Sequence, residues 1–443
     1  IFLELTGRYD GSSKFAKDHR YAFFPSVSAA WRISEENFWQ PLKGWWNDMK
    51  IRGSYGSLGN QVMDDLGNFP YLATYGTNSS YNYLINGSKP VIVKAPGLVA
   101  PDFTWETVTQ MDFGFDASFL NNRLTGTFDW YRRNTKDMLV AGATLPATLG
   151  ASVPKSNSAD MKTIGWELSL GWNDRLENGF SYWVKGVLSD YQATITKYAG
   201  NDAGFYSQSD GDGKYYVGQK IGEIWGYHSN GLFQSDDEAA TIDQSELYAG
   251  KWGAGDVKYE DLDNDGKITK GEETIYNPGD KSIIGNKTPR YQFGITVGFD
   301  YKNFDFEMFW QGTGKRDYML SGAQFWGFTS QWDVPYTPAL DYWTETNTDA
   351  YFPRPGWQNG GNRVTSDRYL QSAAYGRLKN LTVGYTIPKN LTTKWGISRL
   401  RLYVTGENLL TITPLNDAFD PETLGGMTYP INRKVAIGLN LTL

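Results

Sequence analysis

The chain has 443 residues, and its 42 Lys+Arg against 49 Asp+Glu give a net charge of −7, which excludes a basic surface for nucleic acid. Cysteine is absent, so disulfides, thiolate metal sites and cysteine nucleophiles are excluded as well. His19 and His228 are the only imidazoles, which disfavours acid–base catalysis and histidine metal clusters. The composition therefore predicts neither a nucleic-acid partner nor an enzyme.

The remaining composition favours strands over helices. Aromatic residues make up 16% of the chain and glycine occurs 49 times, a combination typical of strands, tight turns and aromatic belts. The mean hydropathy is −0.50, and no stretch approaches the roughly 18 consecutive apolar residues of a membrane helix. These values exclude a helical membrane protein but not a membrane barrel, whose strands carry apolar residues only at alternate positions.

Strict alternation of apolar and polar residues predicts the strands. In residues 111–119, for example, Phe113 and Phe115 alternate with Asp112 and Asp116. In chain order the expected strands are 1–8, 21–31, 46–58, 111–119, 123–133, 163–172, 181–196, 291–301, 304–310, 381–387, 399–410 and 434–443. Residues 1–8 have neither the basic start nor the cleavage site of a signal peptide. We therefore interpret them as part of a strand that this sequence enters part-way along.

The length of these strands separates two all-β architectures. A soluble sandwich also alternates, because one face of each sheet meets water. Alternation over about 9–11 residues with Trp or Tyr near the ends is, however, what a tilted strand needs to cross a bilayer. The sequence therefore predicts a large antiparallel transmembrane β-barrel wall of about 12 strands, with Asp, Glu, Gly and Thr facing a wet lumen.

The connections differ in length as the two rims of a barrel do. Short turns are expected at residues 121–122, 175–179 and 302–303. Long connections cover residues 59–104, 198–288 and 313–374 and are rich in Gly, Asn, Asp, Tyr and Trp. Loops of that length usually carry function, and we expect them on the extracellular rim.

Several segments resemble one family in sequence order. They are residues 8–15 (RYDGSSKF), 24–26 (FPS), 30–38 (AWRISEENF), 375–388 (YGRLKNLTVGYTIP), 402–410 (LYVTGENLL), 420–422 (DPE) and 429–430 (YP). The whole chain, residues 1–443 as a single region, resembles the SusC-like (RagA-like) branch of the TonB-dependent outer-membrane transporters of Bacteroidetes. Leu443 departs from the pattern, since such barrels typically end in an aromatic residue.

The resemblance carries expectations about fold and function. It implies the C-terminal half of a barrel of about 22 strands, with the plug domain, the N-terminal strands and the TonB-contacting segment outside this chain. It also implies active import of a bulky solute, an oligosaccharide or a peptide, across the Gram-negative outer membrane. The implied partners are TonB, the lipid bilayer, the remainder of the same barrel and a SusD-like surface lipoprotein.

Residues 261–272 (DLDNDGKITKGE) match the calcium-loop pattern D-x-[DN]-x-[DN]-G-x5-E. Calcium takes six to eight oxygen ligands, and this loop offers carboxylates together with one main-chain carbonyl. The expected ligands are Asp261, Asp263, Asp265, the carbonyl of Lys267 and a bidentate Glu272. We expect a structural Ca²⁺ site without the usual flanking helices; an acidic solvated turn is the alternative.

Loop tryptophans and lumenal carboxylates are the remaining candidates. Flat indole faces suit sugar rings, and the candidate substrate contacts are Trp252, Trp326, Trp332, Trp343 and Trp357. The alternative is that these side chains pack their own loops. Asp112, Asp116, Glu167, Asp300, Asp305 and Glu307 would line a solute path or pair with Arg and Lys on neighbouring strands. No Ser/His/Asp arrangement is readable.

Two other functions stay open at this point. Within membrane barrels the alternative is a siderophore or cobalamin receptor. From a different class, the alternative is a soluble calcium-dependent all-β binding module, such as a lectin. The two classes differ in solubility, because a barrel wall without detergent aggregates whereas a lectin stays dispersed.

Overall fold

The computed structural model describes the chain except for residues 62–66, 79–83, 86, 101–102, 143–145, 152, 207–213, 249, 426–428 and 430. Pro430, one of the residues that carry the family resemblance, therefore lies outside the described residues. Among the described residues, no helix is both long and apolar enough to span a membrane.

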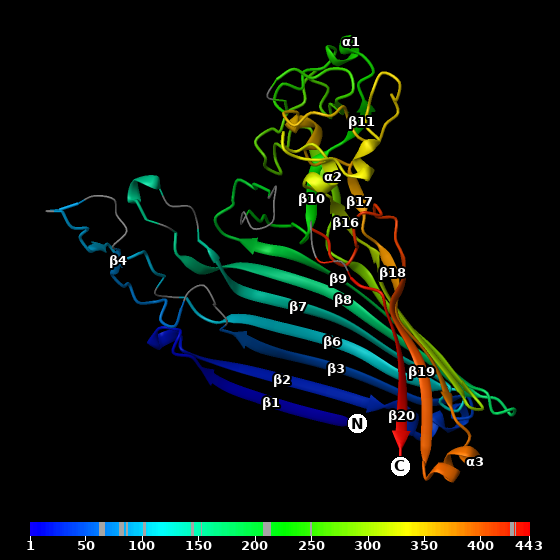
Figure 1. Cartoon of the computed structure of the whole chain (residues 1–443). Coiled ribbons are helices and arrows are strands. Elements are labelled where there is room, and N and C mark those ends of the chain that lie inside the picture. The colour runs from blue at the N-terminus through cyan, green and yellow to red at the C-terminus, as the bar shows by residue number, and fades with distance from the viewer. Residues whose placement is uncertain are drawn as a thin grey trace.

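A single antiparallel sheet of 12 strands dominates the chain, as the alternation predicts (Figure 1). In sheet order it consists of β1 (Phe2–Gly11), β2 (Tyr21–Arg32), β3 (Trp46–Asn60), β6 (Glu106–Phe119), β7 (Leu124–Ala141), β8 (Lys155–Arg175), β9 (Ser181–Tyr198), β14 (Arg290–Tyr301), β15 (Phe304–Lys315), β18 (Tyr375–Thr386), β19 (Arg399–Ile412) and β20 (Lys434–Thr442). Each strand pairs with its sequence neighbour in the sheet, so the wall is a continuous meander.

The remaining elements are short and lie in the connections. Pairs of small strands are β4 (Gly76–Asn78) with β5 (Ile92–Lys94), β10 (Glu223–Tyr227) with β13 (Lys281–Asn286), β11 (Ser229–Leu232) with β12 (Val257–Tyr259), and β16 (Asp317–Met319) with β17 (Leu370–Ser372). The α-helices are α1 (Asp236–Ala239), α2 (Ala323–Trp326) and α3 (Lys389–Thr392). The 3₁₀ turns are Lys17–His19, Ile33–Glu35, Asn37–Leu42, Ala147–Leu149, Thr337–Leu340, Gly360–Arg363 and Thr393–Trp395.

The two rims differ as expected. One rim carries the tight turns β6–β7, β8–β9 and β14–β15, and Asn121 and Asn122 turn the chain between β6 and β7 in the left-handed conformation that asparagine tolerates. Lys302 has a positive φ at the β14–β15 turn. The opposite rim carries the three predicted long connections, two of which rise together above the sheet in Figure 1.

The two faces of the sheet also differ. On β20, Val435, Ile437, Leu439 and Leu441 are all exposed on one face, as are Phe113 on β6 and similar residues elsewhere. Exposed apolar side chains in a continuous band are what a lipid-facing barrel surface presents. The other face carries the charged and small residues of the candidate site.

Candidate functional site

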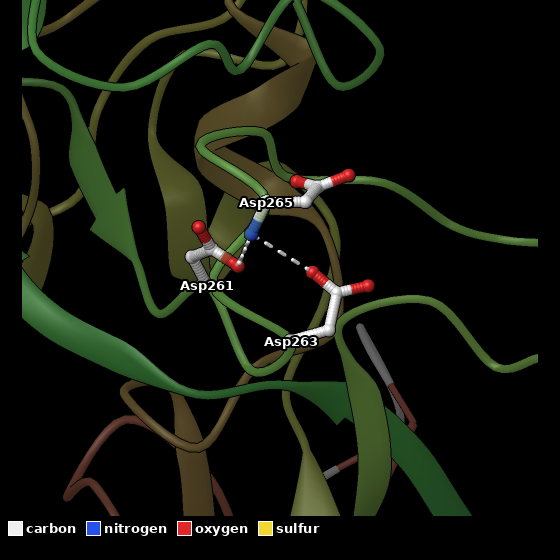
Figure 2. A group of neighbouring side chains, drawn as sticks. All are labelled: Asp261, Asp263 and Asp265. Carbon is white, nitrogen blue, oxygen red and sulfur yellow. Dashed lines mark hydrogen bonds between the residues drawn. The ribbon is translucent and has the colours of Figure 1, made fainter.

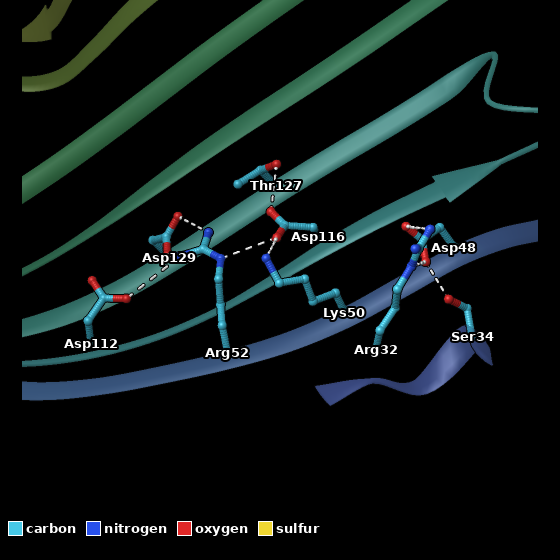
Figure 3. Close-up of polar contacts among 9 residues, drawn as sticks. All are labelled: Arg32, Ser34, Asp48, Lys50, Arg52, Asp112, Asp116, Thr127 and Asp129. Atoms are coloured by element: carbon cyan, nitrogen blue, oxygen red, sulfur yellow. Dashed lines mark hydrogen bonds and ion pairs between the residues drawn. The ribbon is translucent and has the colours of Figure 1, made fainter. Parts of the chain in front are cut away.

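A cluster of charged side chains lies on the polar face of β3, β6 and β7 (Figure 3). Arg52 donates from Nη2 to Asp129 Oδ2 at 2.6 Å and from Nε to Asp116 Oδ2 at 3.3 Å. Asp112 Oδ1 lies 3.8 Å from Arg52 Nη1, and Lys50 Nζ lies 3.6 Å from Asp116 Oδ2. Two cations and three carboxylates therefore hold three strands together on this face.

A glycine allows Arg52 to reach Asp129, which lies two strands away. Strand register places Gly114 of β6 between Arg52 of β3 and Asp129 of β7. A Cβ on Gly114 would lie 2.9 Å from Arg52 Cζ and closer still to the Asp129 carboxylate. Because glycine has no side chain, the guanidinium crosses β6 and pairs with a carboxylate two strands away.

The same arrangement recurs further along the wall. Arg401 of β19 donates from Nε to Asp305 Oδ1 of β15 at 2.9 Å, across Gly384 of β18. Of the carboxylates expected on the lumenal face, Asp112, Asp116 and Asp305 thus pair with cations of neighbouring strands. Glu167 lies on the same face, opposite Asp129 in the β7–β8 register.

Above the sheet, the β9–β14 and β15–β18 connections pack into one body, here called the tower (described residues of 199–289 and 316–374; Figure 1). Its apolar core joins residues from both connections, including Tyr259 and Ile268 from the first and Phe325 and Tyr369 from the second. In sequence the two sets of core residues are separated by β14 and β15, so local patterns do not reveal that they meet.

A buried carboxylate locks the two halves of the tower together. Asp256, in the first connection, has 0% exposure and accepts hydrogen bonds from Arg354 Nε at 2.9 Å and Arg354 Nη2 at 2.5 Å. Asn362 Nδ2 donates to it at 2.9 Å and Asn359 Nδ2 at 3.2 Å, both from the second connection. The amide of Gly253 donates at 2.9 Å. Every donor that this carboxylate needs is therefore supplied by protein.

The acidic loop brings three of its five predicted ligands together. Asp261, Asp263 and Asp265 have carboxylate oxygens that all lie within 4.8 Å of one another, while Glu272 is not a member of that group (Figure 2). The amide of Asp265 donates to Asp261 Oδ1 and to Asp263 Oδ1, each at 3.2 Å. Gly266 has φ +84, the conformation that the sixth position of a calcium loop requires.

The electrostatics of this loop are uneven. Desolvation would raise the pKa of Asp261, but hydrogen bonds from the Gly266 and Asn264 amides bring it below its usual value. Desolvation and then the neighbouring Asp265 charge raise the pKa of Asp263. The cluster thus holds one stabilised and one disfavoured anion, and a cation between them would relieve the repulsion.

Asp280 lies outside this loop but holds it, a role that the sequence pattern did not reveal. Its carboxylate, buried within the tower, accepts from the Leu262 amide at 2.7 Å and from the Thr269 amide at 2.7 Å. Asp280 therefore links Leu262, at the beginning of the acidic loop, to Thr269 near its end. Ile268, at the eighth loop position, is buried in the tower core and its amide donates to the carbonyl of Asp243 at 2.7 Å.

The comparisons with known proteins identify the family. The family model described as "TonB dependent receptor-like, beta-barrel" matches residues 2–409. The chain belongs to the TonB-dependent receptor β-barrel family. It is 31% identical, over 99% of its length, to TonB-dependent receptor P3 of Formosa agariphila, covering 43% of that protein. It is 28% identical, over 99% of its length, to TonB-dependent receptor SusC of Bacteroides thetaiotaomicron, covering 42% of it.

A solved structure agrees in fold. The RagAB peptide transporter structure matches 99% of this chain with a TM-score of 0.78 at 22% identity, and the match covers 45% of that chain. The chain spans less than half the length of the relatives it matches. These findings confirm the SusC-like resemblance, the all-β barrel class and the outer-membrane location, and they set aside the soluble binding module.

In this TonB-dependent receptor chain, the five candidate tryptophans all lie in the tower and fall into two groups. Trp252 and Trp343 pack against the tower core, and Trp326 is part of it with 9% exposure. Trp332 is 82% exposed and Trp357 is 47% exposed. A contact with solute stays a prediction for all five; the exposed indoles of Trp332 and Trp357 are the ones free to make it.

The tower also contains a Ser–His–Asp chain that the sequence did not reveal. His228 Nε2 lies 2.7 Å from Ser282 Oγ, and His228 Nδ1 lies 2.8 Å from Asp367 Oδ2. The other oxygen of Asp367 accepts from the Ser229 amide, and its side chain is 39% exposed, whereas a catalytic triad carboxylate is buried. These contacts join three segments of the tower, which is a structural role.

Proposed function

We propose that the protein to which this wall belongs imports a bulky solute, an oligosaccharide or a peptide, across the outer membrane with energy supplied through TonB. The observation that carries the proposal is the SusC relative, similar over 99% of this chain, together with a sheet whose long connections all lie on one rim. The RagAB peptide transporter has the same fold over this region. No catalytic step is part of the proposal.

The proposed partners follow from the relatives and from the tower. A SusD-like lipoprotein would cap the long-connection rim, where the tower offers a large folded surface. Strands β1 and β20 are the edges of the sheet within the described residues, and we propose that they pair with further strands of the same barrel. The plug and the TonB contact would lie outside this chain.

Deletion and co-purification test this function. Removing the gene should abolish growth on one glycan or peptide source, and affinity purification from the native membrane should recover a surface lipoprotein. A point variant that blocks TonB coupling should reproduce the growth defect. Unchanged growth on every candidate source, together with purification free of any lipoprotein, would contradict the proposal.

For the acidic loop we propose a structural Ca²⁺ held by Asp261, Asp263 and Asp265, completed by the Lys267 carbonyl and Glu272. Three convergent carboxylates and the positive φ of Gly266 support a site for a hard cation. Calcium suits the proposed bidentate Glu272 and a flexible loop, whereas Mg²⁺ demands a tight octahedron. Free calcium is plentiful on the extracellular side, where we place this rim.

Calcium should order this loop. In the assembled protein, millimolar Ca²⁺ should slow amide exchange across residues 261–272, because the ion removes the repulsion among the carboxylates. The variant Asp263→Ala/Asp265→Ala should lose this protection and leave the exchange of β14 and β15 unchanged. The matched variant Asp202→Ala/Asp237→Ala, at exposed tower positions, should keep it. Identical exchange with Ca²⁺ and with chelator in the unaltered protein would show that the pattern match is accidental.

A further inference from the structure

A further connection, between β19 and β20, lies against both the tower and the wall. Its described residues 413–425, here called the strap, send Leu415 into the tower core and place the ring of Phe419 6.2 Å from that of Phe325. Gln324 Nε2 also donates to the carbonyl of Ala418 at 3.2 Å. One side of the strap is therefore packed onto the tower.

The other side of the strap is bound to the wall by charges. Arg377 of β18 is 3% exposed and donates from Nη2 to Asp420 Oδ2 at 2.6 Å. Lys379, two residues further along the same strand, donates to Glu422 Oε2 at 2.8 Å. The guanidinium is oriented by Thr411 of β19, whose Oγ1 accepts from Nε at 2.8 Å. We call the four charged residues Arg377, Lys379, Asp420 and Glu422 the clamp.

The clamp pairs two positive with two negative charges, but two of its buried atoms have no hydrogen-bond partner. Arg377 Nη1 and Glu422 Oε1 lie 3.3 Å apart, and both atoms are buried without a hydrogen-bond partner. An ion pair in a buried position holds only while both partners are present, because either charge left alone is costly. Two cations on the wall thus depend on two carboxylates that arrive on a loop.

We propose that the clamp fastens the strap to the wall and that the strap thereby fixes the position of the tower over the sheet, with Arg377 and Lys379 as positioning residues. The tower is otherwise joined to the wall through its own chain ends and through backbone hydrogen bonds to β9, such as those from the Ile195 amide to the Gln219 carbonyl and from the Ile221 amide to the Ala193 carbonyl, each at 2.9 Å. The strap belongs to a separate connection, between β19 and β20. Its release from the wall would let the tower move as one body relative to the sheet.

Amide exchange in the assembled outer-membrane protein tests this inference without knowledge of the solute. The variant Arg377→Gln should speed exchange at least tenfold in residues 413–425, and also in the contacting tower residues 320–326. Asp420→Asn/Glu422→Gln, which alters only the loop, should do the same. Arg377→Lys, which keeps a cation at this position, should restore much of the protection.

A matched control removes an ion pair of the neighbouring strands β19 and β20. Lys434 Nζ lies 3.6 Å from Glu407 Oε2, and both side chains are well exposed, so Glu407→Gln should leave exchange at the strap unchanged. Strap and tower exchange that stays at the unaltered rate in Asp420→Asn/Glu422→Gln would overturn the inference. Equal acceleration throughout β14–β19 in that variant would overturn it too, because the clamp would then stabilise the wall rather than the tower.

Discussion

Replacing Leu168 by arginine should cost the assembled wall about 2–4 kcal/mol, the penalty for a cation on the lipid face near the bilayer midplane. Leu168 lies within β8, opposite Phe128 of β7 and Leu188 of β9, on the apolar face of the sheet. Arginine there would have to leave water for hydrocarbon. The folded fraction, measured from the outer membrane by heat-modifiable gel mobility, should fall strongly.

Ser169 is the matched control for this prediction. It is the next residue of β8, opposite Thr127, and points to the other face of the strand because side chains alternate. Ser169→Arg should therefore assemble nearly as well as the unaltered protein. Equal assembly of both variants would show that the two faces of β8 do not differ in environment, and the membrane-wall interpretation would be wrong.

Asp256→Ala should destabilise the tower by about 3 kcal/mol, because the change leaves Arg354 and two asparagine side chains without their shared acceptor. Among the residues that the structure describes, Asp256 is the only fully buried carboxylate that joins the two connections, and the change removes it. Limited proteolysis should cut the tower much faster, while the 12-stranded wall keeps its gel mobility.

An exposed aspartate of the tower provides the comparison. Asp237 lies in α1, and Asp237→Ala should leave the proteolysis rate unchanged, since exposed charges contribute little. Asp256→Asn keeps the shape of the side chain but not its charge. Its proteolysis rate should lie between those of Asp256→Ala and Asp237→Ala. A tower that resists protease equally in all three variants would show that the two connections are held by the apolar core alone.

The wall could be predicted from the sequence because its signal is local. Alternation in residues 163–172 and 123–133 predicted β8 and β7, yet both strands run further, to 21 residues in β8 and 18 in β7. The extra length lies at the long-connection rim, where the strands leave the apolar band. Alternation weakens there because neither face of the strand meets lipid.

The tower could not be predicted in the same way. Asp256 meets Arg354 and Asn362 across about 100 residues, and Asp280 closes the acidic loop from outside its twelve-residue pattern. The loop pattern itself identified Asp261, Asp263 and Asp265 because calcium ligands follow a fixed spacing. Burial of Trp326 depends on Phe325 and Tyr369 around it, and composition alone does not distinguish it from exposed Trp332.

Cysteine labelling of intact cells tests most directly whether this chain is an outer-membrane wall with its long connections outside. This chain has no cysteine, so one introduced at Tyr276 in the tower and another at Lys302 in a short turn are the only labelling sites within it. A membrane-impermeant maleimide should label Tyr276→Cys on intact cells and Lys302→Cys only after lysis. Labelling of Lys302→Cys on intact cells, or of neither site before lysis, would contradict the proposed placement of this wall in the outer membrane.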